Sequence, residues 1–282
     1  MTPGPLRTLT SGLQPDQQPA LWDDHVSVYE QVFERLTNDL GARALARLKL
    51  RMAEKLIDVG AGAGGTALLA AAAGAHVFAV DASEGMVKRI RERATGRELG
   101  GNVRAEVMDG MALNVPDETF DAAVSLFGVI LFPDAELGMR ELFRVLKPGG
   151  RVAVVTWTEP ERYELITRLI AAITKVRGPQ APPPVLPAQL RFRDSPVFRR
   201  FLLQGGFRVD EITRVEAQWH AKTARWLADN INFAPGMAAM TKGLGDDLTD
   251  VLDAFVDGMQ HDFGTGEVKL TAVAAIGIAT KR

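Results

Sequence analysis

The stretch that decides the fold runs from residue 56 to residue 65 and reads Leu56-Ile57-Asp58-Val59-Gly60-Ala61-Gly62-Ala63-Gly64-Gly65. Its apolar first half is typical of a short buried strand, and the alanine- and leucine-rich residues 66–73 are typical of a helix. The glycines between them permit a tight turn and let a ligand approach the backbone without a Cβ in the way. Because the helix behind the turn presents free N–H groups and a positive dipole end, the stretch predicts a site for a nucleotide-like cofactor.

Three acidic residues stand where three successive predicted strands end. Asp58 lies in the end of the strand before the glycines, Asp81 ends the strand 76–81, and Asp109 follows the strand 103–108. A carboxylate at Asp58 would repel a pyrophosphate, whereas it can accept a hydrogen bond from an ammonium group. The Asp81 carboxylate suits two ribose hydroxyls, and Asp109 could accept from an adenine amino group. These acids therefore discriminate between nucleotide cofactors.

The glycine spacing by itself leaves other interpretations open. Gly60, Gly62 and Gly65 satisfy G-x-G-x-x-G, the fingerprint of dinucleotide-binding proteins, so an NAD(P)-dependent oxidoreductase is an alternative. The carboxylates of Asp58 and Asp109 argue against an NAD(P)-dependent oxidoreductase. A tight turn without a ligand is the plainer alternative for the glycines.

Residues 51–160 alternate between strand and helix patterns and form the predicted cofactor-binding core. Such alternation over about 100 residues predicts a parallel, doubly wound α/β sheet. Residues 1–19 are predicted to be a mobile arm, and residues 20–50 to form lid helices over 21–36 and 42–50. The predicted core strands are 55–59, 76–81, 103–108, 120–127 and 151–157, and the predicted core helices are 66–73, 83–94 and 135–146.

Behind the core the pattern becomes mainly helical. Residues 161–265 are predicted to form an acceptor cap with an inserted strand over 207–219, and residues 266–282 to supply a final strand of the core sheet, over 270–279. Prolines at 179, 182, 183, 184 and 187 mark a loop or linker. Cap helices are expected over 162–176, 195–203, 223–233 and 247–259.

The composition excludes several classes of protein. The 282 residues carry 33 Lys plus Arg and 35 Asp plus Glu, a net charge of -2, whereas a general nucleic-acid binder would show a basic field. The absence of cysteine rules out disulfides, a thiolate nucleophile and a Cys-ligated metal site, and we predict no bound metal. No secretory signal and no stretch of roughly 20 apolar residues is present. We therefore expect a cytoplasmic protein without a membrane span, of unknown oligomeric state.

Five motifs follow one another through the core: LIDVGAGAGG at 56–65, VFAVDASEGM at 77–86, EVMDGMAL at 106–113, FDAAVSLFGVILFPD at 120–134 and LKPGGRVAVVTW at 146–157. Their order and spacing resemble a class I S-adenosylmethionine-dependent methyltransferase, in the small-molecule branch that includes the quinone-biosynthesis C-methyltransferases. The resemblance covers about residues 50 to 160. It implies a Rossmann-like, mostly parallel seven-stranded sheet with a reversed last strand, plus helical cap elements.

The resemblance also implies roles for single residues, with S-adenosylmethionine as cofactor and S-adenosylhomocysteine as product. The methionine end of the cofactor is held by Asp58 and the glycine turn, the ribose by Asp81 and the adenine amino group by Asp109. A lid helix over 22–36 brings Tyr29 to the amino-acid end. The remaining implied cofactor contacts are Gly60, Ala61, Gly62 and Gly64 in the turn, Ala82 and Met86 along the adenosine, Met108, Gly110 and Met111 around the adenine, and Ser125, Leu126 and Phe127 beneath the sulfonium.

The acceptor site is predicted to be apolar. Many relatives carry histidine after the fourth strand, but this chain has Val-Ile-Leu-Phe at 129–132, which leaves an apolar wall and argues against histidine catalysis there. His25 or His220 could serve as a general base, although a structural role is the commoner one for each. The predicted acceptor contacts are Trp22, Ile130, Phe132, Trp157, Trp219, Phe233 and Met237.

The predicted function is methyl transfer from the sulfonium to an O, N or C atom of a small, apolar or aromatic molecule by in-line SN2 displacement. Since the sulfonium charge already activates the leaving group, orientation and water exclusion can supply much of the catalysis. A protein that binds the cofactor without methylating stays an alternative, because a fold does not fix its chemistry. A nucleic-acid acceptor is disfavoured, because 125–128 replaces an Asn/Asp-Pro-Pro-aromatic motif.

Overall fold

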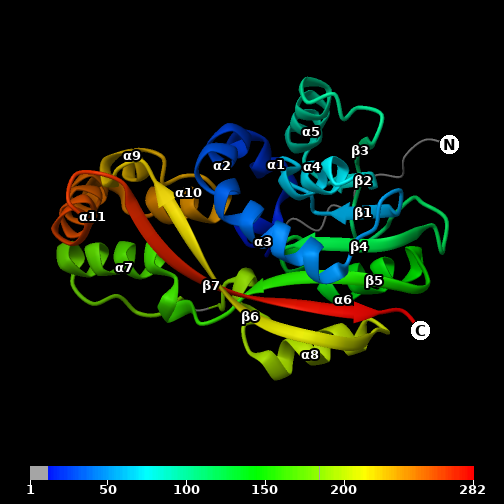
Figure 1. Ribbon diagram of the computed structural model, residues 1–282. Helices are drawn as coiled ribbons and strands as arrows, with labels where there is room; N and C mark the ends of the chain where they lie inside the picture. Colours follow the sequence, from blue (N-terminus) through cyan, green and yellow to red (C-terminus); the bar gives the residue numbers. More distant parts are fainter. Residues whose placement is uncertain (1–11, 184) are drawn as a thin grey trace.

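The apolar strand that leads into the glycine turn, β1 (Lys55–Val59), lies inside a seven-stranded sheet of order β3-β2-β1-β4-β5-β7-β6 (Figure 1). The computed structural model describes residues 12–183 and 185–282. Strands β1 to β5 pair in parallel, and β7 is antiparallel to β5 and β6. The predicted mostly parallel sheet with a reversed last strand is therefore confirmed. The other strands are β2 (His76–Asp81), β3 (Val103–Val107), β4 (Phe120–Leu126), β5 (Leu146–Trp157), β6 (Arg208–Ala221) and β7 (Val268–Thr280).

The strand order reverses at β1, which has β2 on one side and β4 on the other. In open α/β sheets, ligands bind beyond the carboxyl ends of the strands at such a reversal. Asp58 pairs with Ala79 of β2 and with Val124 of β4, so the three strands end side by side. The glycine turn, Asp81 and the residues after β4 therefore meet at one edge of the sheet.

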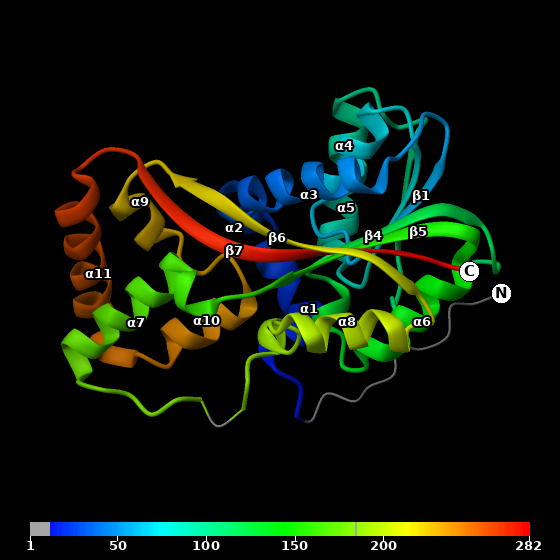
Figure 2. The ribbon, with the colours of Figure 1, turned by 60° about the horizontal axis from the view of Figure 1, so that its bottom comes forward.

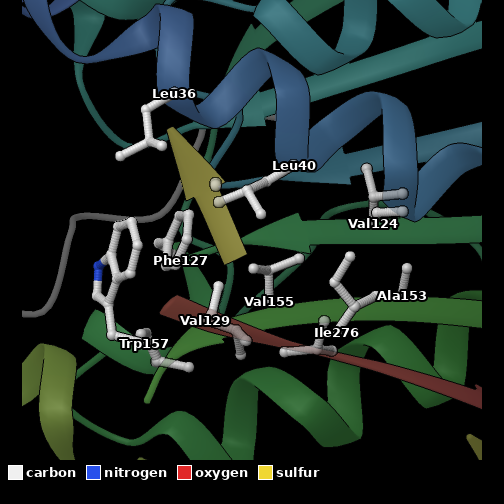
Figure 3. Close-up of a cluster of buried hydrophobic side chains, with 14 of the residues drawn as sticks. Leu36, Leu40, Val124, Phe127, Val129, Ala153, Val155, Trp157 and Ile276 are labelled. Carbon is white, nitrogen blue, oxygen red and sulfur yellow. The ribbon is translucent and has the colours of Figure 1, made fainter. Parts of the chain in front are cut away.

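Helices cover both faces of this sheet (Figure 2). One face carries α3 (Glu34–Leu48), α4 (Gly65–Ala72) and α5 (Glu84–Gly96), and the other carries α6 (Ala135–Val145) and α8 (Ser195–Gln204). Leu36 and Leu40 of α3 are fully buried above the sheet, near Val124 and Val155 (Figure 3). Burying one such leucine contributes about 1.5–3 kcal/mol, so α3 is held chiefly by its apolar face.

The lid differs from the prediction of one helix over 21–36 and another over 42–50. The chain forms α1 (Pro19–Trp22), a 3-10 turn (Asp23–His25) and α2 (Val26–Val32), and α3 then runs on unbroken to Leu48. The predicted boundaries are wrong because tertiary contacts override the apolar period. The Asp23 carboxylate, for example, accepts hydrogen bonds from Gly85 N at 2.8 Å and from Ser83 Oγ at 2.6 Å.

Strands β6 and β7 continue beyond the rest of the sheet as a two-stranded ribbon. The last β5 residue, Trp157, pairs with Ala274, whereas residues 268–273 of β7 pair only with β6. Four helices pack around this extension: α7 (Glu164–Arg177), α9 (Ala224–Asp229), α10 (Pro235–Lys242) and α11 (Leu248–Phe263) (Figure 1). Helix α10 was not predicted, and the helix expected over 223–233 ends at Asp229.

The structure describes only part of the predicted N-terminal arm, since residues 1–11 lie outside the described residues. Beyond them, Gln14 Nε2 donates to Leu186 O at 3.0 Å, and Asp16 accepts from Gly236 N at 2.7 Å. This segment therefore contacts both the proline-rich loop and α10. Across residues 12–183 and 185–282, no helix is long and apolar enough to cross a bilayer.

We expect Gly277→Ala to lower the free energy of unfolding by about 1–3 kcal/mol, because it overpacks the contact between β7 and α8. A Cβ at Gly277 would lie 2.7 Å from Leu202 Cδ1 and 3.0 Å from Phe198 Cε1, and both side chains are fully buried. Urea unfolding followed by circular dichroism measures the change. Gly258→Ala in α11 is the matched control: its Cβ meets nothing within 4 Å, so we expect a gain of up to about 1 kcal/mol. Equal effects of the two substitutions would contradict this packing.

Candidate functional site

The glycine turn after β1 requires glycine for two separate reasons. Gly60, Gly62 and Gly64 have φ angles of 71°, 54° and 86°, in the left-handed region that side chains disfavour. A Cβ on Gly60 would also lie 2.8 Å from the Cα of Gly128, which belongs to the loop after β4. The turn is therefore packed against that loop, and its backbone position is fixed before any ligand binds.

Asp58 is a buried carboxyl group beside this turn. The residue is 2% exposed, and its Oδ2 atom has no hydrogen-bond partner within the part of the chain that the structure describes. Burial, and then the negative charge of Asp81, raise the pKa of the Asp58 carboxyl to about 7, against the weaker effect of the Ala67 backbone N–H. An unpartnered buried oxygen of this kind calls for a donor, and a cationic donor suits it best.

Asp81 turns its side chain toward the same glycines. Its Oδ2 accepts from Gly62 N at 2.8 Å, and its Oδ1 accepts from Ser83 N at 2.9 Å. Burial raises the pKa of the Asp81 carboxyl in spite of these backbone donors. Two carboxyl groups thus flank the turn, which makes the site favourable to cations and unfavourable to a pyrophosphate.

The residues implied for the adenine, 108–111, follow β3. Asp109 Oδ1 accepts from Met111 N at 2.8 Å, and Met108 Sδ accepts from Asn114 N at 3.3 Å. The ring of Phe132 lies directly against Gly110, in the space that a Cβ there would need. Phe132, predicted as an acceptor contact, therefore packs beside the residues implied for the adenine.

Met86 lies in the first turn of α5, which follows Asp81 at the carboxyl end of β2. Met86 is buried at 2% exposure, and its backbone N–H donates to Ser83 Oγ at 3.1 Å. Ser83 is thus the helix-capping residue. The Asp81 carboxyl is therefore not needed as the helix cap and is available for another role. Ala82 lies between Asp81 and Ser83 in the chain.

The lid closes over the glycine turn. Tyr29 Oη would lie 3.4 Å from a Cβ on Gly62, and burial, and then the charge of Glu34, raise the pKa of the Tyr29 hydroxyl. Three ion pairs hold the lid to α5: Glu34 with Arg93 at 2.5 Å, and Glu30 with Arg89 at 2.6 Å and with Arg93 at 3.6 Å. The small pocket that remains is lined by Tyr29, Glu34, Thr37, Asp58, Gly60, Ala61, Gly65, Thr66 and Leu126.

Glu34, Thr37 and Thr66 in this lining were not predicted. Their side chains reach the pocket from α3 and α4, and the sequence carries no signal for them because a single acid or threonine within a helix pattern is usually a solvated residue. The burial of Glu34, whose side chain is 6% exposed beside Arg93, appears only in the folded chain.

Two residues at the carboxyl end of β4, Ser125 within the strand and Phe127 directly after it, have different structural roles. Ser125 Oγ donates to Val59 O at 2.7 Å and accepts from Val129 N at 2.9 Å, so the fully buried hydroxyl braces β4 against the end of β1. Phe127 has a φ angle of 60° and stacks on Trp157 with ring centroids 4.1 Å apart (Figure 3). That stacking helps to hold Phe127 in a backbone conformation that bulky residues rarely adopt.

A cluster of eight aromatic side chains begins at the glycine turn, and we call it the aromatic cluster. Phe33 lies at its centre, with ring centroids 5.6 Å from Tyr29, 6.0 Å from Trp157 and 5.6 Å from Trp219. The cluster gathers rings from the lid, from the ends of β4 and β5, and from the cap. Its members are Trp22, Tyr29, Phe33, Phe127, Trp157, Tyr163, Trp219 and Phe233.

Four of the predicted acceptor contacts are members of this cluster: Trp22, Trp157, Trp219 and Phe233. Two others are buried residues of the hydrophobic core, namely Ile130 after β4 and Met237 in α10. Phe33 and Tyr163 were not predicted. An aromatic residue in a helix pattern looks like ordinary core, and only the shared contacts reveal the group.

Each of the two histidines considered as a base has a polar partner. His25 Nδ1 is 2.8 Å from Asn232 O, which ties the lid to the cap. His220 Nδ1 is 3.2 Å from Glu267 Oε1, and the side chain is 39% exposed. Because strand neighbours point to opposite faces, His220 faces away from the side on which Trp219 is buried.

Comparison with known proteins agrees with this geometry. Residues 57–154 match the family described as a methyltransferase domain. A demethylmenaquinone methyltransferase of Clavibacter sepedonicus is 37% identical over 153 residues, which cover 52% of this chain and 60% of that protein. A 27-O-demethylrifamycin SV methyltransferase of Amycolatopsis mediterranei is 35% identical over 134 residues, which cover 47% of this chain and 48% of that protein. The chain thus matches only about half to three-fifths of the length of these relatives.

Solved structures share the fold across most of the chain. The cyclase SpnF has a TM-score of 0.62 at 21% identity, over 95% of this chain and 97% of that one. The YcgJ protein of Bacillus subtilis has a TM-score of 0.57 at 20% identity, over 86% and 97%. The sheet is thus Rossmann-like, as in these solved structures. The match over residues 57–154 to a methyltransferase domain confirms the resemblance found in the motifs.

The raised pKa of Asp58 predicts a specific pH dependence for stability without ligand. Its pKa lies near 7 in the folded chain and near 3.8 in the unfolded one, so the folded state binds more protons between these values and stability falls as pH rises from about 4 to about 7. We expect Asp58→Asn to remove this fall, so that its stability relative to the parent protein increases by roughly 2–4 kcal/mol across that window, at about 1.4 kcal/mol per pKa unit.

Urea unfolding at pH 4, 5, 6, 7 and 8 tests this expectation. Asp253→Asn is the matched control, because Asp253 is exposed on α11. A stability difference between Asp58→Asn and the parent that stays constant with pH would show that the Asp58 carboxyl is not destabilised by burial.

Proposed function

We propose that this chain transfers a methyl group from S-adenosylmethionine to a small, apolar or aromatic molecule. The observation that carries the proposal is the buried, unpartnered oxygen of Asp58 beside the glycine turn, in series with Asp81 and Asp109. A cofactor with an ammonium group at one end and an adenosine at the other matches this series of acceptors.

Each part of the cofactor has residues suited to it. The Asp58 carboxylate would accept from the ammonium group, and the Asp81 carboxylate from the ribose hydroxyls. Asp109 would accept from the adenine amino group, while Phe132 forms an apolar wall against Gly110. Tyr29 would cover the amino-acid end from the lid.

The acceptor would lie on the side of the aromatic cluster. When bound, the cofactor supplies a methyl group on a sulfonium, which transfers by in-line SN2 displacement. The rings of Phe33, Trp157 and Phe127 exclude water and favour flat apolar molecules, so this chain contributes mainly orientation and desolvation. We propose no histidine base, since His25 and His220 are engaged with Asn232 and Glu267. Several relatives of this chain are named as demethylmenaquinone methyltransferases.

Cofactor binding is the first test. Calorimetric titration with S-adenosylmethionine and S-adenosylhomocysteine should show binding of both, and Asp81→Ala should weaken it at least about tenfold, since a hydrogen bond to a charged group contributes about 1.5–3 kcal/mol. NAD(H) should not bind. Asp253→Ala on α11 is the matched control.

Folded protein that binds neither ligand would overturn the proposal, and binding of NAD(H) alone would favour the oxidoreductase. Formation of S-adenosylhomocysteine with added acceptors then separates methyl transfer from a fold that binds the cofactor for another reaction.

Asp58 also predicts proton release on binding. At pH 6 a carboxyl with a pKa of about 7 is mostly protonated, whereas an ammonium partner favours its ionised form. Binding of S-adenosylhomocysteine should therefore release close to one proton at about pH 6 and almost none at about pH 8.

Titrations in buffers of different ionisation enthalpy measure this number. Asp58→Asn should abolish the release at pH 6, whereas Asp253→Asn should leave it unchanged. Equal proton release at both pH values would exclude Asp58 as the partner of the ammonium group.

A further inference from the structure

The aromatic cluster contains one polar feature that core packing does not explain. Trp219 is 1% exposed, and its indole Nε1 has no hydrogen-bond partner within residues 12–183 and 185–282. A buried tryptophan N–H usually finds an acceptor, because leaving it unpaired is costly. By contrast, Trp22 in the same cluster donates its Nε1 hydrogen to Asp16 O at 3.0 Å.

The fold places this donor on the acceptor side of the site. Trp219 pairs with Leu270 in the part of the β6–β7 ribbon that extends past β5. It lies four residues beyond Val215, the partner of Ala274, which is roughly 13 Å along the strand. The ribbon thus carries the Trp219 indole past the end of the sheet, toward the cap.

Three rings surround the Trp219 indole. Phe33 and Phe233 meet it edge to face, with centroids 5.6 Å and 5.3 Å away, and Tyr163 lies 6.5 Å away. Phe33 and Phe233 are themselves stacked, 5.1 Å apart and 12° from parallel. The parallel rings of Phe33 and Phe233 lie next to the unpartnered N–H of Trp219. This arrangement suits a flat molecule that carries a hydrogen-bond acceptor on its edge.

Access of a ligand to the space between Phe33 and Phe233 depends on the lid. Phe33 stands at the junction where α2 ends and α3 begins. A movement at this junction would separate Phe33 from Phe233 and leave a flat space between them. Its neighbour Tyr29 lies 5.6 Å away and reaches the glycine turn, so the same movement is coupled to the cofactor end of the site.

We propose that the Trp219 Nε1–H donates a hydrogen bond to a carbonyl or phenolic oxygen of a planar aromatic acceptor bound between Phe33 and Phe233. This inference deepens the proposed function and rests on it. Trp219 is then a residue that selects the acceptor and orients it, and it takes no part in bond making. An aromatic hydrocarbon of the same shape would fill the space and leave the donor unpaired, and discrimination would follow from that difference.

The direct test follows the indole N–H signals by two-dimensional ¹H–¹⁵N NMR of the full chain with saturating S-adenosylhomocysteine. Four tryptophans give four such signals, and Trp22→Phe, Trp157→Phe and Trp226→Phe assign that of Trp219 by elimination. The probes are 1,4-naphthoquinone, which has two carbonyl oxygens, and naphthalene, which has none. The chain has no cysteine, so the quinone meets no thiol with which to react.

The expected result is a downfield shift of the Trp219 indole proton with 1,4-naphthoquinone and not with naphthalene. A Trp219 signal that moves equally with both probes, or with neither, would overturn the proposal. Because the assignment uses other variants, the result does not depend on Trp219→Phe folding. The signal can also be followed without S-adenosylhomocysteine, so a failure of cofactor binding, seen by calorimetry, is distinguished from a failure of this inference.

A binding measurement gives the size of the effect. Trp219→Phe keeps the ring but removes the N–H, and we expect it to weaken 1,4-naphthoquinone binding about fivefold while naphthalene binding stays within about twofold, as for loss of one neutral hydrogen bond. Trp226→Phe is the matched control, because Trp226 lies on α9 and its ring contact is with Lys222. Equal weakening for both probes would assign Trp219 a packing role and reject the hydrogen bond.

Discussion

The close approach of two backbone segments underlies the rest of this structure. The glycine turn after β1 and the loop after β4 touch at Gly60 and Gly128, where a Cβ on either residue would lie within 2.9 Å of the other's Cα. Ser125 completes the contact by donating to Val59 O and accepting from Val129 N. This contact joins the two strands at the reversal of the sheet. Asp58 before it and Phe127 beyond it therefore keep fixed positions, on the sides that we propose for the cofactor and the acceptor.

Buried carboxyl groups dominate the side of the site that we propose for the cofactor. Burial raises the pKa of both Asp58 and Asp81, and the charge of Asp81 raises the pKa of Asp58 further. The lid adds Glu34, but Arg93 neutralises it at 2.5 Å. Among residues 12–183 and 185–282, no cationic side chain pairs with Asp58 or Asp81, so the site that we propose favours a cation.

The side that we propose for the acceptor consists of aromatic rings and not of carboxyl groups. These rings lie far apart in the sequence. Phe33 comes from the lid, Trp157 from the end of β5, and Trp219 from the β6–β7 ribbon. The length of that ribbon decides how far Trp219 lies from the glycine turn. Changes in the ribbon and its helices would thus alter the proposed acceptor side and leave the residues proposed for the cofactor in place, which agrees with one fold serving different chemistry.

The sequence by itself determined the parallel strands, the glycine turn and the acids Asp58, Asp81 and Asp109, because each depends on neighbours within a few residues. Apolar runs bounded by glycine or aspartate predict strands, and parallel strands bring their carboxyl ends together. Only the tertiary structure decided the break in the lid, the burial of Glu34, the placement of Phe132 beside Gly110 and the aromatic cluster. These features arise from contacts between residues about 20 to 200 positions apart, such as Gly110 with Phe132, Asp23 with Gly85 and Phe33 with Phe233. A local pattern carries no information about such pairs, because their energies exist only once the chain has folded.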